Sequence, residues 1–154
     1  MDIEKLISFF NIEYKDKEFL EFLKYYGVDL IKDIEIDTEI QYAFFCNYEN
    51  GYDLMFDDEA VFKHTGGIGI SGNYYFSCVH FYAQEVDGHN GYNGEIFNVI
   101  KMTDKIGEVR AKLKEDYKRH DFLDADIYIY KDLDIFIDYK KKNTPQIISI
   151  SLVR

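Results

Sequence analysis

One cysteine and one histidine lie at a spacing that could serve covalent catalysis. Cys78 and His80 are two residues apart, and in a β-strand such a pair lies on one face. There the imidazole could act as the base that activates a thiolate nucleophile. The same spacing also arises in an ordinary strand that carries a packed cysteine and a hydrogen-bonded histidine, and we favour this second interpretation. We therefore predict no catalytic residues and no enzymatic activity.

The glycine-rich segment 66–72 matches the sequence pattern of a nucleotide-binding loop but lacks the secondary structure that flanks such a loop. Gly67, Gly69 and Gly72 follow the pattern G-x-G-x-x-G. In dinucleotide-binding proteins a strand precedes this pattern and a helix follows it, so that the phosphates meet the N-terminus of the helix. Here the residues that follow, Tyr74–Ala83, predict a strand. The segment is therefore predicted to be a flexible loop, and no cofactor is expected.

No set of residues has the spacing of a metal site. His64, His89 and His120 are isolated from one another and from other ligands. The segment 87–91 resembles a calcium loop in composition, but it lacks acidic residues at every second position and the terminal bidentate glutamate. For the acidic triplet 57–59 a cation site and a solvated turn are the alternatives, and we favour the turn. With 29 acidic residues in the chain, no pair stands out as the two carboxylates of a hydrolase.

The negative charge of the protein is confined to the middle of the chain. Residues 33–100 contain twelve acidic residues and one base, Lys63, and this segment carries the entire formal net charge of −11. The flanking residues 1–32 and 101–154 contain equal numbers of acids and bases. A charge needed only for solubility would be spread more evenly. The acidic residues of the segment are Asp33, Glu35, Asp37, Glu39, Glu49, Asp53, Asp57, Asp58, Glu59, Glu85, Asp87 and Glu95.

The sign of this charge indicates the kind of partner. Nucleic acids and anionic membranes both select for Lys and Arg, so we expect neither of them as a partner. A basic protein fits an acidic surface better. The alternative is an acidic protein that has no charged partner and uses its charge for solubility alone.

Aromatic residues alternate with the acids around residue 50. Tyrosine is enriched in the buried centres of protein interfaces, and carboxylates around it would steer a basic partner toward it. We therefore predict that a partner binds along residues 48–59, with the acidic triplet exposed at the end of this segment. The predicted partner-binding residues are Glu49, Tyr52, Asp53, Asp57, Asp58 and Glu59.

The sequence carries no pattern of export or membrane insertion. Residues 1–10 are amphipathic and lack the apolar core of a signal peptide, and no apolar run reaches the roughly 20 residues of a membrane span. Cys46 and Cys78 are too few for a disulfide scaffold. We interpret them as reduced core residues, and a disulfide between them is the less favoured alternative. We expect a single domain of 154 residues in the cytoplasm.

The hydrophobic pattern predicts both helices and strands. Helices are expected over residues 3–10 behind the cap Asp2, over residues 17–26 between Asp16 and Gly27, and over residues 106–117 behind Thr103 or Asp104. Asn50-Gly51 predicts a hairpin with a type I′ turn. Alternating apolar residues predict strands at residues 42–48, 52–56, 74–83, 96–100, 127–130, 133–139 and 146–153.

These elements predict an α+β fold with an antiparallel sheet and helices packed on one side. The order helix, strand, strand, strand occurs twice, once from Asp16 to Ala83 and once from Asp104 to Val153. This order is expected of two α-β-β-β halves that share a core. Coincidence within one α+β domain explains it equally well.

Several short segments follow one another in a recognisable order: Gly51-Tyr52-Asp53-Leu54-Met55-Phe56, Gly91-Tyr92-Asn93-Gly94-Glu95-Ile96-Phe97, the Thr103–Leu113 helix and the Leu133–Tyr139 strand. The chain resembles, over residues 42–153, the small immunity proteins of bacterial polymorphic-toxin and contact-dependent growth-inhibition systems. The resemblance implies a cytosolic inhibitor that binds a cognate toxin domain, commonly a basic nuclease, and blocks its active site or another essential surface. The alternative function is a small enzyme or ligand-binding domain with a pocket beside Cys78 and His80.

Overall fold

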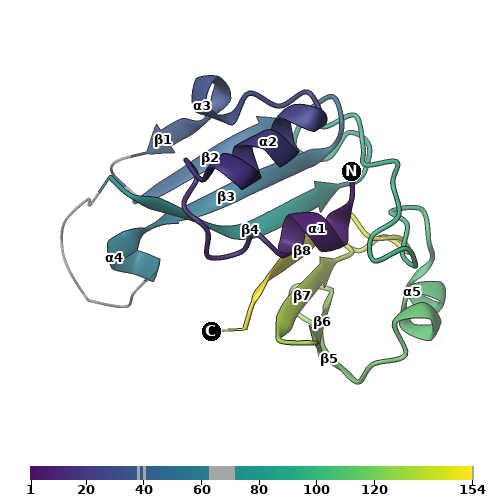
Figure 1. Ribbon diagram of the computed structural model, residues 1–154. Helices are drawn as coiled ribbons and strands as arrows, with labels where there is room; N and C mark the ends of the chain where they lie inside the picture. Colours follow the sequence, from purple (N-terminus) through teal and green to yellow (C-terminus); the bar gives the residue numbers. More distant parts are fainter. Residues whose placement is uncertain (38, 40, 63–71, 154) are drawn as a thin grey trace. The chain divides into compact units, whose positions relative to one another are not determined.

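The computed structural model describes residues 1–37, 39, 41–62 and 72–153 (Figure 1). Within them the chain forms two compact units, Met1–Cys46 with Leu54–Cys78, and Asn47–Asp53 with Val79–Arg154. The helices are α1 (Ile3–Ile7), α2 (Lys17–Tyr25), α3 (Leu30–Asp33), α4 (Glu59–Phe62) and α5 (Ile106–Leu113). The strands are β1 (Glu35–Asp37), β2 (Tyr42–Asn47), β3 (Tyr52–Asp58), β4 (Tyr74–Tyr82), β5 (Tyr117–His120), β6 (Ala125–Tyr130), β7 (Leu133–Asp138) and β8 (Ile147–Leu152).

The predicted fold class is confirmed. In the described part of the chain, the sheet is antiparallel and its eight strands follow the order β1-β2-β3-β4-β8-β7-β6-β5. Strands β1 to β4 are neighbours in chain order, and so are β5 to β8. Each half therefore contributes four strands, one more than the sequence predicted, and in the first half helix α4 lies between β3 and β4. None of the helices among the described residues is long and apolar enough to cross a membrane.

The N-terminal helices begin where their caps predict. A side-chain oxygen of Asp2 accepts a hydrogen bond from the backbone nitrogen of Lys5 at 3.0 Å. Asp16 does the same for Phe19 at 3.0 Å. Each bond satisfies one of the backbone N–H groups that the first helical turn leaves without a partner.

The core of the first unit is built from aromatic rings. Phe19 of α2 is fully buried, and its ring centroid lies 6.2 Å from that of Phe56 in β3 and 5.2 Å from that of Phe76 in β4. Phe9, shortly after α1, packs on Phe19 at 5.0 Å. Burying each of these side chains stabilises the fold by about 1.5–3 kcal/mol. The same rings therefore hold the N-terminal segment against β3 and β4.

The core of the second unit follows the alternation read from the sequence. Leu133, Ile135 and Ile137 of β7 are buried, whereas the residues between them are half-buried. Ile135 pairs with Ile150 of β8, and Ile137 pairs with Ile148. One face of these strands is thus packed and the other is partly open to solvent.

The third helix differs from its prediction at both ends. Helix α5 starts at Ile106, where Glu108 accepts a hydrogen bond from the backbone nitrogen of Lys105 at 2.7 Å. Asp104, one of the two predicted caps, instead contacts Lys112 at 2.8 Å. Lys114 adopts a left-handed conformation with φ of +55° and ends the helix. Tyr117, expected in the helix, therefore begins strand β5.

A buried carboxylate ties α5 to the sheet. Asp126 of β6 is fully buried and accepts two hydrogen bonds from Arg110 of α5, at 2.9 and 3.0 Å. It also accepts from Arg119 at 3.2 Å and from the Tyr139 hydroxyl at 3.1 Å. Burial by itself would raise the pKa of Asp126, but the hydrogen bonds from Arg110, Arg119 and Tyr139 and the charge of Arg110 outweigh it and lower the pKa.

Two predictions about shorter features were wrong. Residues 96–100 form a turn closed by an isolated bridge between Ile96 and Ile100, and not a strand. Cys46 and Cys78 are not joined in a disulfide, but both are half-buried and do not belong to the fully buried core. The sequence did not predict the four-residue helices α3 and α4.

Candidate protein-binding surface

The hairpin of β2 and β3 is confirmed, but its turn is longer than predicted. The turn spans residues 48–51 and is closed by a hydrogen bond from the Gly51 nitrogen to the Asn47 carbonyl at 2.9 Å. The Asn47 side chain accepts from the backbone nitrogen of Asn50 at 3.0 Å. A two-residue type I′ turn would have left Tyr48 and Glu49 in the strand. In the observed turn both residues lie at the tip and are exposed.

A second loop, residues 83–92, lies directly against this turn. The backbone nitrogen of Asn90 donates to the Tyr48 carbonyl at 2.8 Å, and that of Tyr82 donates to the Gly51 carbonyl at 2.9 Å. Gly51 has a φ of +70°, and a Cβ atom there would lie 2.3 Å from the backbone of Gly91 and Tyr92. Only glycine therefore permits this approach.

His89 fixes the loop to the hairpin. Its imidazole is buried, with Nε2 at 2.8 Å from a carboxylate oxygen of Asp53 and Nδ1 at 3.2 Å from the Val86 carbonyl. The ring stacks on Tyr82, with centroids 3.9 Å apart, and contacts the Tyr48 ring at 4.8 Å. The Val86 carbonyl and the Asp53 carboxylate are both hydrogen-bond acceptors, so each ring nitrogen of His89 faces an acceptor. In the sequence His89 was weighed only as a metal ligand, and no local pattern indicated its pairing with Asp53.

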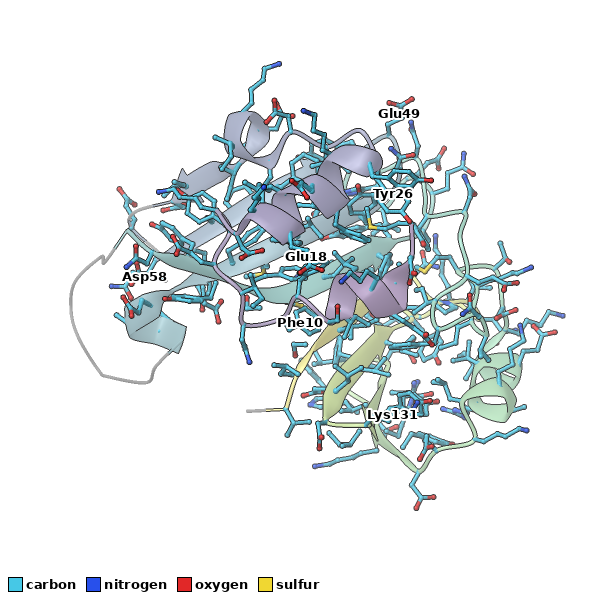
Figure 2. The ribbon with its side chains drawn as sticks, viewed as in Figure 1. Phe10, Glu18, Tyr26, Glu49, Asp58 and Lys131 are labelled. Carbon is cyan, nitrogen blue, oxygen red and sulfur yellow. The ribbon has the colours of Figure 1, made fainter. Side chains whose placement is uncertain are left out.

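The contact of loop and turn creates a surface that we call the hairpin-end surface. Tyr48 lies at its centre with 54% of its area exposed. Asp87 lies 3.6 Å from Lys140, an exposed base that partly offsets its charge. Figure 2 shows the Glu49 side chain extending outward from the ribbon. The surface consists of Tyr48, Glu49, Glu85, Asp87 and Asn90, all exposed.

Of the predicted partner-binding residues in the second unit, only Glu49 is exposed. Tyr52 is buried, and its hydroxyl accepts from the Asn47 side chain at 3.1 Å. Burial raises the pKa of Tyr52, and the hydrogen bond from Asn47 opposes this rise. Asp53 is buried under His89. Tyr52 and Asp53 therefore support the hairpin-end surface from below, and a partner would not touch them.

The prediction that the acidic triplet is exposed is wrong. Asp57 is 3% exposed and Asp58 is fully buried. Asp57 accepts a hydrogen bond from the Ser77 hydroxyl at 3.0 Å. Asp58 accepts from the backbone nitrogens of Ala60 at 2.9 Å and Gly72 at 3.2 Å, and so caps the start of α4. These donors compensate the cost of burying a carboxylate.

Glu59 is the one member of the triplet that remains half-exposed. It accepts a hydrogen bond from the Asn73 side chain at 3.2 Å. All three acids of the triplet belong to the first unit, whereas Glu49, Tyr52 and Asp53 belong to the second.

His80 has a partner other than Cys78. Its Nδ1 atom lies 2.7 Å from the Ser149 hydroxyl of β8. Burial lowers the pKa of His80, against the opposing charge of Asp53, so its ring is neutral at pH 7. Along β4 the buried positions change from Tyr74 and Phe76 to Ser77 and Val79, which leaves Cys78 and His80 both half-buried. The contact with Ser149 gives one ring nitrogen of His80 a hydrogen-bond partner on the neighbouring strand.

The remaining motifs of the sequence add no further site. Among the described residues there is no group of three or more His, Cys, Asp or Glu that could hold a metal ion. His64 and the glycine-rich segment up to Ser71 lie outside the described residues. No protein-family model, no curated protein and no solved structure matches this chain.

Proposed function

We propose that this protein is a non-enzymatic inhibitor, an immunity protein that binds and neutralises a basic toxin domain in the cytoplasm. The toxin would belong to a bacterial polymorphic-toxin or contact-dependent growth-inhibition system. The observation that carries the proposal is the exposure of the acidic middle segment, in which Lys63 is the only base. Seven of its acids are exposed: Asp33, Glu35, Glu39, Glu49, Glu85, Asp87 and Glu95.

The charge supports a role in the encounter with a basic partner. An excess of carboxylates on one protein raises its rate of association with a positively charged partner by roughly 10–10³-fold. Ion pairs within the protein reduce this excess only in part, because among the described residues only two of these seven acids form an ion pair with a base. Those pairs are Asp87 with Lys140 at 3.6 Å and Glu95 with Lys101 at 3.1 Å.

The hairpin-end surface supports a role in the complex that follows. Tyr48 offers a large aromatic side chain whose backbone and ring are fixed by Asn90 and His89. Exposed tyrosines of this kind are frequent among the residues that dominate binding energy. A tyrosine held in place before binding loses little conformational freedom when the partner arrives. The toxin would thus be steered by the acids and occluded around Tyr48.

A co-expression experiment tests this proposal. The C-terminal domain of a large secreted protein encoded beside this gene would be expressed with and without the protein. We expect growth arrest without it, and rescue together with a stable complex when it is present. Tyr48→Ala with Glu49→Lys should weaken the complex at least about tenfold, which corresponds to 1.4 kcal/mol. Tyr25→Ala with Glu21→Lys is the matched control, since Tyr25 is 83% exposed on α2, and it should leave binding unchanged.

The proposal would be refuted if neighbouring toxin domains arrest growth in the presence of the protein and form no complex with it. Equal weakening by both variant pairs would leave inhibition intact but remove the hairpin-end surface from the mechanism.

A small enzyme is the second candidate, and the 2.7 Å contact between His80 and Ser149 is the observation in its favour. That distance suits a base and a hydroxyl nucleophile. Under the inhibitor proposal, Cys78→Ala and His80→Ala together should preserve growth rescue in a folded protein. Loss of rescue by that folded double variant would favour the enzyme.

A further inference from the structure

The edge strand β1 presents an acidic rim to solvent. Among the described strands, β1 pairs only with β2 and ends the sheet, and Figure 1 shows it at the outer edge of the first unit beside α3. In an antiparallel ladder, alternate residues direct their N–H and C=O groups away from the paired strand. One or two of the three residues of β1 therefore point these groups outward, where another strand could pair with them.

The side chains of this rim differ between the two faces of the sheet. Glu35 lies opposite Phe44, and Asp37 lies opposite Tyr42, so that carboxylates flank two half-buried aromatic rings. Ile36 lies on the other face, opposite the buried Ala43, and is 46% exposed. A strand added here would cover apolar surface on both faces and meet carboxylates on one of them.

The charge around β1 determines which kind of strand could pair with it. Asp33 and Glu39, both exposed, lie just before and after the strand. Between Lys32 and Lys63 the sequence contains no base at all. Charged edge strands resist pairing with their own kind, because like charges repel. A second copy of this chain is therefore disfavoured at β1, whereas a strand that carries lysine or arginine at alternate positions is attracted.

We propose that β1 is a docking edge that accepts an extended, basic segment of the partner protein as an additional strand. This inference rests on the proposed function for the identity of the partner, but the chemistry at the edge does not depend on it. Backbone hydrogen bonds to β1 would fix the direction of the added strand, as in other cases of strand addition. Alternate basic side chains would reach Glu35 and Asp37, and apolar side chains between them would reach Ile36.

A synthetic peptide tests the inference without the toxin. The probe is an end-capped peptide in which lysine and valine alternate over six residues, titrated into the full-length protein. Backbone amide NMR should show shifts centred on Glu35–Asp37, together with slower hydrogen exchange there. Two peptides serve as controls: one with glutamate in place of lysine, and one that is N-methylated at alternate residues on the pairing edge. Neither should bind.

A charge-reversed variant of the protein provides a second test of the inference. Glu35→Lys with Asp37→Lys should raise the Kd of the lysine peptide by about tenfold or more, because two attractive pairs become repulsive. Glu115→Lys with Asp116→Lys changes the net charge equally at exposed positions of the second unit, and should change the Kd less than about twofold. The NMR signals of residues away from the substitutions report whether each variant is folded. The comparison of the three peptides uses the wild-type protein and therefore does not depend on the folding of a variant.

Equal binding of the N-methylated peptide would overturn the inference, because charge attraction would then act without strand pairing. Shifts confined to other residues, or equal weakening by the two variant pairs, would overturn it as well. Failure of the peptide experiment leaves the growth-rescue test of the inhibitor untouched. Conversely, peptide binding at β1 without growth rescue would refute the toxin as partner and keep the docking edge.

Discussion

The Nε2 atom of His89 lies 2.8 Å from a carboxylate oxygen of Asp53, and both side chains are buried. The two residues are 36 positions apart in the sequence. Their contact joins the loop 83–92 to the hairpin of β2 and β3, and it sets the position of the exposed Tyr48. The hairpin-end surface therefore depends on a pair that a partner would not touch.

Removing one residue of this pair should destabilise the protein more than replacing both residues by apolar ones. Asp53→Ala leaves the histidine buried beside an empty site and should lower the free energy of unfolding by about 3 kcal/mol. The double variant Asp53→Leu with His89→Phe replaces the pair by apolar side chains and should recover at least half of that loss. Urea unfolding measures both values. A loss below about 1 kcal/mol for Asp53→Ala would show that the pair does not hold the loop.

The neutral state of His80 should make stability depend on pH. Burial lowers the pKa of His80 from its ordinary value of 6.5 in the unfolded chain. The unfolded state therefore binds a proton at a pH at which the folded state does not. The stabilisation is present above pH 6.5 and is lost as the pH falls through the lowered pKa. The difference in unfolding free energy between wild type and His80→Gln should shrink on acidification from about pH 7.5 to pH 5. A difference that grows over this range would contradict the assignment.

Two glycines should respond in opposite directions to alanine. Gly51→Ala places a Cβ atom 2.3 Å from the neighbouring backbone at a φ of +70°, and should lower the melting temperature strongly. Gly107 lies in α5, where a Cβ atom would meet nothing within 4 Å. Gly107→Ala should therefore stabilise the protein, by about 0.5–1 kcal/mol. Thermal unfolding checks both, and a tolerated Gly51→Ala would refute the close contact of loop and turn.

The stability of the protein should also depend on the charge of Asp126, the buried carboxylate that binds Arg110 of α5. Asp126→Asn keeps the shape of the side chain but removes the charge that two arginines share, and should destabilise the protein by about 3 kcal/mol. The control is Asp134→Asn, the same substitution at a half-buried aspartate of β7. Its free energy of unfolding should stay within about 0.5 kcal/mol of the wild-type value. Chemical unfolding that ranks the two variants equally would contradict the role of Asp126.

Local signals predicted local structure well. Asp2 and Asp16 were identified as caps because a capping side chain bonds a backbone group only three residues away. The alternation along β7 predicted its buried face for the same reason. Strand β5 was missed because it is short and charged, and because its pairing with β6 defines it more than its own residue pattern does.

The candidate site was predicted only in part because burial depends on distant residues. Asp57 and Asp58 resemble an exposed acidic turn in the sequence, yet their donors include Ser77 and Gly72, which come 20 and 14 residues later. The sequence predicted Glu49 as a partner-binding residue, and Glu49 is exposed at the tip of the hairpin. The sequence could not indicate that the loop carrying Glu85 and Asp87 lies against the turn carrying Tyr48, since His89 and the Asn90 backbone make that contact.

The rate of association with the proposed basic toxin domain tests the central claim most directly. Glu49, Glu85 and Asp87 would be changed together to lysine, and the control would carry lysine at Glu21, Glu115 and Asp116, which are also exposed. Both triple variants change the net charge equally. We expect stopped-flow measurements at low salt to show association about tenfold slower for the first variant than for the control. The difference should shrink as salt shortens the screening length toward about 8 Å. Equal and small effects of the two variants at every salt concentration would contradict the account, because the acidic segment would then serve solubility alone.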